Sequence, residues 1–153
     1  MWSDKKNRLY FVETETKKTT LGVHAEAWEI RDYNWSPDSK WIVYSKPEVD
    51  VMTKVYIYSL DAKESYAVTD GWFSSYGGAF SADGKYLFFI SNRSFNPTYG
   101  QTEWNHIYQD VAKIYLVTLS KDVKSPFEPK SDEVKVTEEQ KEVEKDKEKE
   151  KEK

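Results

Sequence analysis

Several chemistries are excluded by what this 153-residue sequence lacks. It contains no cysteine, which rules out disulfides and thiolate metal sites and leaves the redox compartment undecided. It has only two histidines, His24 and His106, and no Gly-x-Ser-x-Gly, His-Glu-x-x-His, phosphate-loop or EF-hand pattern. We therefore predict no catalytic residue, no metal site and no cofactor in this chain.

Long apolar runs and a strong charge of one sign are also missing. No run reaches the length of a transmembrane helix, and no apolar segment typical of a signal peptide follows Met1. The formal net charge is −4, and lysine and arginine do not gather along one set of predicted strands. We expect neither a membrane nor nucleic acid as a partner.

A repeated phrase is the most informative feature that is present. Residues 34–44 read NWSPDSKWIVY and residues 79–89 read AFSADGKYLFF, 45 positions further on. Each copy joins an aromatic residue, a Ser-x-Asp-(Ser/Gly)-Lys turn and a dense run of β-formers. A tyrosine-bearing run also recurs, at Tyr10, Tyr56 and Tyr115. A period of about 40–50 residues built from short strands is typical of β-propeller blades.

The turn chemistry explains why the phrase recurs. Pro37 presets φ for the second turn position, and Asp38 can bond its own backbone. Asp83 repeats Asp38, and Gly84 supplies the left-handed conformation that often follows a type I turn in a hairpin. Ser39 takes the place of Gly84 in the first copy at some steric cost. We predict that each turn joins two antiparallel strands.

The repeat predicts an all-β chain that forms an incomplete β-propeller of about two and a half four-stranded antiparallel blades. Residues 1–29 would hold the last two strands of a partial blade, residues 30–75 a complete blade, and residues 76–124 a further blade with a long inserted loop at 92–111. Strands are expected near residues 8–14, 18–24, 30–36, 40–46, 54–60, 64–69, 76–81, 85–91 and 112–119.

Two runs indicate strands that are covered on both faces. Trp41–Tyr44 and Tyr86–Ile90 are almost continuously apolar and do not alternate with polar residues. Blades stacked face to face would provide this cover, so we expect most aromatic side chains to pack between blades.

The C-terminal segment has a different composition. Residues 125–153 begin with a proline-containing exit from the last strand, and 15 of the 19 residues from Lys135 to Lys153 are charged. Such a segment cannot bury a core, so we predict a solvated linker that is disordered or, at most, a fraying helix.

The inserted loop is the candidate for a binding role. Tyr56 and Tyr115 are 59 positions apart, about 14 more than one repeat, and the extra residues fall between Ser91 and Val111. Long loops are often functional. The residues predicted to contact a peptide or line a channel are Arg93, Tyr99, Glu103, Trp104, Asn105 and His106. The alternative is that the loop's aromatic residues fold back over the blade edge while Arg93 and Glu103 pair.

The repeat phrases at 35–40 and 80–85 are similar to those of TolB-type and peptidase propellers. The stronger resemblance, over residues 3–134, is to tricorn-type serine peptidases of bacteria. It depends on residues 87–93, 95–99, 102–106 and 114–119, followed by Ser125-Pro126-Phe127. The Lys/Glu segment looks like the junction between the first and second propellers of that family, so the resemblance places the chain late in the first, TolB-like propeller.

The resemblance implies a propeller segment that gates or channels peptides to a protease core outside this chain. Its partners would be peptides or unfolded polypeptide, together with the remaining blades and protease domain of the same protein. The parent protein would be a serine peptidase, a homo-oligomer, and cytoplasmic or alternatively periplasmic. The family's catalytic motifs lie outside its propellers, so none is carried over to a residue here.

Two other functions remain open. The chain could be a non-enzymatic TolB-like propeller that scaffolds protein contacts, or the propeller of a prolyl-oligopeptidase-like enzyme.

Overall fold

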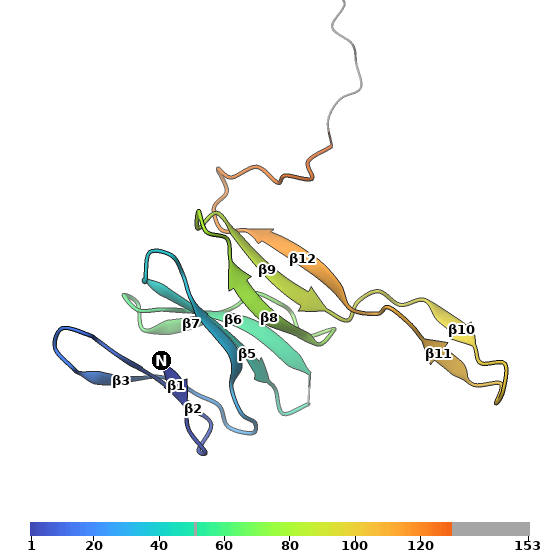
Figure 1. Cartoon of the computed structure of the whole chain (residues 1–153), viewed down its shortest axis with the longest axis horizontal. Coiled ribbons are helices and arrows are strands. Elements are labelled where there is room, and N and C mark those ends of the chain that lie inside the picture. Colours follow the sequence, from blue (N-terminus) through green and yellow to red (C-terminus); the bar gives the residue numbers. More distant parts are fainter. Residues whose placement is uncertain (51, 130–153) are drawn as a thin grey trace, which may run out of the picture.

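The computed structural model describes residues 1–50 and 52–129. These residues form three antiparallel sheets that stand side by side and a separate hairpin that projects from the third sheet (Figure 1). The strands are β1 (Trp2–Ser3), β2 (Arg8–Val12), β3 (Thr19–His24), β4 (Arg31–Trp35), β5 (Trp41–Pro47), β6 (Thr53–Ser59), β7 (Glu64–Ala67), β8 (Ser75–Phe80), β9 (Tyr86–Ser91), β10 (Pro97–Tyr99), β11 (His106–Tyr108) and β12 (Lys113–Thr118).

The sheet order follows the predicted blades. The first sheet has the order β1-β2-β3, the second β4-β5-β6-β7, and the third β8-β9-β12. The second sheet has four strands, and all four lie within residues 30–75, the segment expected to form a complete blade. The all-β, incomplete propeller is therefore confirmed.

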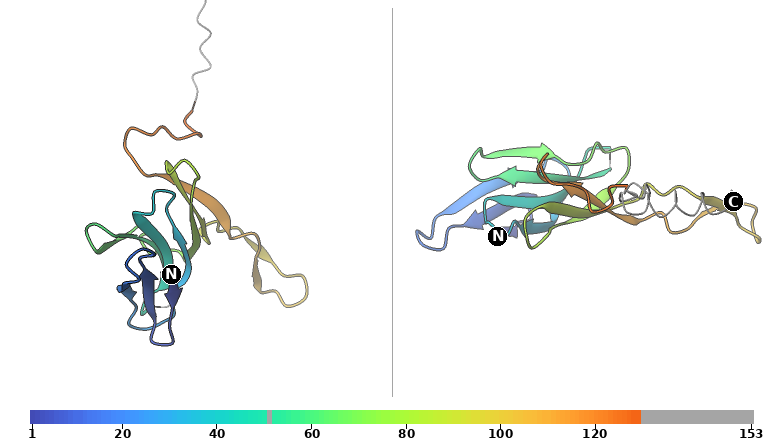
Figure 2. Two further views of the ribbon diagram at one scale, coloured as in Figure 1. Left: turned by 60° about the vertical axis from the view of Figure 1, so that its left-hand side comes forward. Right: turned by 90° about the horizontal axis from the view of Figure 1, so that it is seen from above.

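Three strands were not predicted. Trp2–Ser3 pairs with β2, so the first partial blade has three strands rather than two. The stretch 92–111, predicted as a loop, contains the paired strands β10 and β11. We call residues 92–111 the arm; Figure 2 shows it pointing away from the three sheets. The predicted disordered or helical tail lies outside the described residues from residue 130 onward.

The two repeated turns have the same hydrogen bonds. In the first, Ser36 Oγ donates to Asp38 Oδ1 at 2.6 Å and accepts from the Trp41 N–H at 2.9 Å. The same two bonds, at the same distances, join Ser81 to Asp83 and to Tyr86. Ser39 and Gly84, which follow Asp38 and Asp83 in these turns, both adopt left-handed φ values, 59° and 68°.

The apolar runs alternate between two cores. Leu9, Ile42 and Tyr44 belong to a cluster between the first and second sheets, whereas Val43 and Leu87 belong to one between the second and third. Successive side chains of a strand point to opposite faces, so a strand with a core on each side is apolar at every position. The prediction that these strands are covered on both faces is confirmed for the second sheet.

Each sheet carries a stacked aromatic pair with a cation above its tyrosine. The pairs are Trp2–Tyr10, Tyr44–Tyr56 and Phe89–Tyr115, with ring centroids 5.4–5.9 Å apart. The cations are Arg8, Lys46 and Arg93, which lie 4.7–5.3 Å from the tyrosine centroids. The same arrangement of two stacked rings and a cation therefore recurs in all three sheets, although the cation comes from a different position of the repeat in each.

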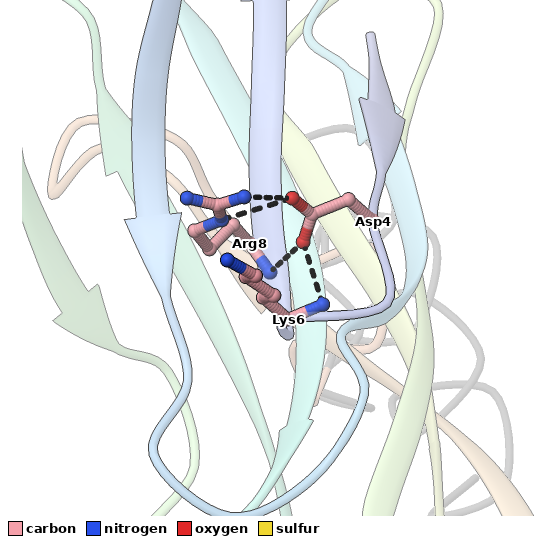
Figure 3. A network of polar contacts seen from close by, with 3 residues as sticks. All are labelled: Asp4, Lys6 and Arg8. Carbon is pink, nitrogen blue, oxygen red and sulfur yellow. Dashed lines mark hydrogen bonds and ion pairs between the residues drawn. The ribbon is translucent and has the colours of Figure 1, made fainter.

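The connection between β1 and β2 is held by one carboxylate (Figure 3). Asp4 accepts hydrogen bonds from the backbone N–H groups of Lys6 and Arg8, and from the Arg8 guanidinium at 2.5 and 2.9 Å. The Arg8 guanidinium, aided by the two N–H groups, lowers the pKa of the Asp4 carboxyl. The network keeps Arg8 above Tyr10.

Candidate functional site

Arg93 lies at the root of the arm and is held by packing. Its Nε donates to Ser91 Oγ at 3.0 Å, and Ser91 in turn accepts from Ser75 Oγ at 2.9 Å. The guanidinium lies 4.7 Å from the Tyr115 centroid and 5.8 Å from that of Phe73. The structure thus separates Arg93 from the other predicted contact residues, and within the described residues it forms no ion pair with Glu103.

The other five predicted residues come together at the end of the arm. Tyr99 and His106 are cross-strand partners with ring centroids 5.0 Å apart. Asn105 Nδ2 donates to Glu103 Oε2 at 3.4 Å, and Trp104 lies beside them in the turn. The side chains of Tyr99 and Trp104 are 71% and 85% exposed, so they do not fold back over a blade edge. The arm presents an aromatic surface to its surroundings.

Trp104 has an unusual backbone conformation for its size. Its φ is +57°, in the left-handed region that bulky residues rarely occupy. The hairpin around it is short, with three cross-strand pairs. A two-stranded hairpin of this length is marginally stable in water. Contact with a binding partner would therefore stabilise the arm more than it would stabilise a strand within a sheet.

A second candidate region, missed by sequence reasoning, lies where the first strands of two sheets meet. Asn34 Nδ2 of β4 donates to the Gly78 carbonyl of β8 at 3.1 Å, and the Gly77 N–H donates to Asp32 Oδ2 at 3.2 Å. The edge strand β7 lies at the opposite side of its sheet. The first strands therefore converge, which is the arrangement of strands that line the centre of a propeller.

Both bonds depend on a bulge that recurs with the repeat. Asp32 and Gly77 are 45 positions apart, have φ values of 51° and 67°, and sit at register shifts in β4 and β8. Aspartate and glycine both tolerate the left-handed region. The only sign of the bulge in the sequence was that Asp32 and Gly77 lie one repeat of 45 residues apart. It could not be predicted from them, because a bulge is recognised from the pairing register and not from the residue type.

A cavity of about 600 Å³ adjoins these strands. Its lining includes Arg31 and Asp32 of β4, Tyr76 of β8, and Trp28 and Glu29 of the preceding loop. Arg31 pairs with Glu29 at 3.0 Å in an exposed position, where an ion pair is easily exchanged for other partners. The region combines aromatic walls with charges of both signs.

The described residues contain no candidate metal site. They contain no group of three or more His, Asp or Glu side chains placed to hold a metal ion. None of their elements is a helix with the length and hydropathy that a membrane crossing needs.

Comparison with known proteins gives the family. The family model "Tricorn protease second beta propeller domain" matches residues 1–153. This chain belongs to that family. The tricorn-type resemblance is therefore confirmed, but the matching domain is described as the second propeller, whereas the sequence analysis placed the chain late in the first.

Relatives and a solved structure agree with this membership. The chain is 30% identical to "Tricorn protease homolog 1" of Streptomyces coelicolor over 80% of its length, and 30% identical to "Tricorn protease" of Thermoplasma acidophilum over 71%. It also aligns with a tricorn protease crystal structure with a TM-score of 0.73, at 26% identity and over 79% of its length. The chain spans 11% of each of these two relatives and 12% of the solved chain.

Proposed function

We propose that this tricorn-type propeller segment gates or channels peptides toward a protease core that lies outside this chain. The observation that supports the proposal best is the convergence of β4 and β8, joined by the Asn34–Gly78 and Asp32–Gly77 hydrogen bonds. In a closed propeller such strands surround a central passage, so polar groups on them would meet a passing chain.

We call the cavity-lining residues Trp28, Glu29, Arg31, Asp32 and Tyr76 the inner rim, and their chemistry suits extended polypeptide. A peptide carries alternating donors and acceptors and side chains of varied polarity. Arg31 and Glu29 offer a charged donor and acceptor, and Trp28 and Tyr76 offer flat apolar surface. The proposed partners are peptides or unfolded polypeptide, with further blades and a protease core of the same protein. We place the homo-oligomeric parent in the cytoplasm, with the periplasm as the alternative.

The test compares charge reversal on the inner and outer sides of the second sheet in the parent protease. Arg31→Glu changes the inner rim, and Lys63→Glu changes the exposed turn between β6 and β7 to the same extent. We expect Arg31→Glu to alter the hydrolysis rate of peptides of ten or more residues severalfold, with little effect on a fluorogenic tripeptide. Equal effects of both variants, or equal effects on both substrates, would exclude channelling past this rim.

The exposed aromatic arm favours a second candidate, a scaffold for protein contacts. Tyr99 and Trp104 are positioned for contact with a partner surface rather than for packing in their own sheet. Peptide contact by Arg93 and by the arm residues stays a prediction. If the arm binds another protein, Trp104→Ala should abolish co-purification with that protein while leaving peptide hydrolysis by the parent unchanged; a selective loss of long-peptide hydrolysis would instead assign the arm to peptide contact.

A further inference from the structure

One hydroxyl in the wall of the cavity at the inner rim is buried without a partner. Ser45 is 1% exposed, and among the described residues its Oγ is the one buried side-chain polar atom that forms no hydrogen bond. Two other buried serines, Ser75 and Ser91, bond to each other at 2.9 Å. An unpaired buried hydroxyl lowers stability, so Ser45 points to a partner that the chain itself does not supply.

Packing of the sheets does not require a hydroxyl at this position. The repeat equivalent of Ser45, 45 residues later, is the apolar Ile90. The backbone of Ser45 is paired with Arg31 on one side and with Val55 on the other, so its side chain is the part that reaches the cavity. The cavity wall extends to Tyr76 of the third sheet, so the described sheets themselves build it.

The wall of this cavity combines excess negative charge with aromatic surface. Its charged residues are Glu29, Arg31 and Asp32, which leaves one carboxylate in excess. The rings of Trp28 and Tyr76 belong to the same wall. A cation placed against aromatic faces and close to carboxylates is stabilised by both. The wall therefore suits a positively charged group.

The cavity mouth already holds a guanidinium. Nε and Nη2 of Arg31 lie 3.2 and 3.0 Å from Glu29 Oε2. The side chains of Arg31 and Glu29 are 73% and 54% exposed, so Arg31 can leave Glu29 for water at little cost. Arg31 thus occupies the place that a cationic side chain from another polypeptide would take.

We propose that this cavity binds the lysine or arginine side chains of peptides that pass the inner rim. Glu29 and Asp32 supply the negative charge, and Trp28 and Tyr76 supply the aromatic walls. Ser45 Oγ accepts a hydrogen bond from an N–H of the bound cation. The inference rests on the proposed channelling function, which brings peptides to the rim, and it adds the kind of side chain that the rim selects.

Fluorescence anisotropy on the full chain tests the selection with dye-labelled decapeptides. The peptides consist of glycine and serine and carry one central arginine, glutamine or glutamate. We expect the arginine peptide to bind at least about tenfold more tightly than the glutamine peptide, and the glutamate peptide to bind most weakly. Equal affinity for the three peptides would overturn the inference.

Two substitutions at the ion pair should act in opposite directions. Glu29→Gln should abolish the preference for arginine, whereas Arg31→Gln should strengthen arginine binding severalfold because it removes the competing cation. The matched control is Glu15→Gln, in the exposed turn between β2 and β3, which should change neither affinity. Weaker arginine binding in Arg31→Gln would contradict the assigned role of Arg31.

Ser45→Ala separates a binding role from a structural one. The substitution removes an unpaired hydroxyl, so urea unfolding should show equal or greater stability, while affinity for the arginine peptide should fall severalfold. Unchanged affinity in a folded Ser45→Ala variant would exclude this hydroxyl from the site.

Hydrolysis by the parent protease distinguishes failure of this inference from failure of channelling. If Arg31→Glu alters the hydrolysis of long peptides to the same extent with and without an arginine, channelling is supported and the basic side-chain site is wrong. If the chain prefers the arginine peptide but Arg31→Glu leaves long-peptide hydrolysis unchanged, the site is supported and channelling past the rim is wrong.

Discussion

Aromatic side chains serve opposite purposes in the sheets and in the arm. Tyr44, in the second sheet, is 1% exposed and stacks on Tyr56, whereas Tyr99 in the arm is 71% exposed with only His106 against its ring. Both are tyrosines on strands. The difference is that a neighbouring sheet covers Tyr44 and no described residue covers the outer side of the arm. The stability that a tyrosine contributes therefore depends on whether neighbouring residues cover its ring, and not on the residue type alone.

The largest expected effect is the difference in unfolding free energy between alanine variants of the buried Tyr44 and the exposed Tyr99. Tyr44→Ala should destabilise the chain by about 3–5 kcal/mol, because it empties a buried site and removes a stacking partner. Tyr99→Ala should change the unfolding free energy by less than about 0.5 kcal/mol, as expected for an exposed side chain. Urea unfolding of both variants is the measurement. Similar losses in the two would show that the arm is packed in solution.

Gly78→Ala tests how tightly the second and third sheets pack against each other. A Cβ at residue 78 would come within 2.4 Å of Val43 Cγ2 and 3.3 Å of Val55 Cγ1. We expect a loss of about 1–3 kcal/mol from overpacking. Combining Gly78→Ala with Val43→Ala should cost less than the sum of the single changes, which a double-mutant cycle would measure. Strict additivity would mean that the second and third sheets are not packed through this contact.

The repeated turns provide a smaller effect. Gly84→Val should cost about 1 kcal/mol or more, because a β-branched residue resists the φ of 68° seen there. Ser39→Gly, at the matching position with φ 59°, should be neutral or mildly stabilising. Thermal melts of the two variants distinguish them. If both variants shift the melting temperature alike, the two turns are not equivalent.

The smallest effect at neutral pH concerns the Tyr44 hydroxyl, which donates to Ser65 Oγ at 3.0 Å. Burial raises the pKa of Tyr44 to about 12, from a usual value of 10.0. Its folded-state pKa is raised, so its contribution is present below pH 10 and is lost as pH rises toward 12.

Tyr44→Phe should therefore cost only about 1 kcal/mol at pH 7 and should reduce the loss of stability between pH 10 and 12. Phenylalanine is the residue at the equivalent position of the third sheet, Phe89. Denaturant titrations at pH 7, 10 and 11.5 measure both quantities. An unchanged alkaline slope would exclude Tyr44 as a titrating group.

The fold was more predictable than the site. The 45-residue spacing of the repeated phrase predicted β4, β5, β8 and β9, because turn residues and apolar runs act locally. The short strand β1 was missed because two residues carry no periodicity. Strands β10 and β11 were missed because Pro97 and Gly100 are typical of loops, and because each strand has only three residues, too few to show a periodic pattern.

The candidate site residues divide in the same way. Tyr99, Glu103, Trp104, Asn105 and His106 were predicted as a group and lie together at the end of the arm. Arg93 was grouped with them by sequence proximity, but Phe73, Phe89 and Tyr115 hold it at the root. The inner rim at Arg31 and Asp32 was not predicted, since its residues come from two repeats that meet only after folding.

The sequence by itself determined the class of fold, the blade period and the turn geometry, because each depends on residue types at short spacing. Only the tertiary structure decided which apolar positions are covered. Val43 and Phe88 occupy one repeat position, but Val43 has a sheet packed over it and Phe88 does not. A side chain is buried only when a second surface covers it, and the sequence of one strand specifies only its own surface.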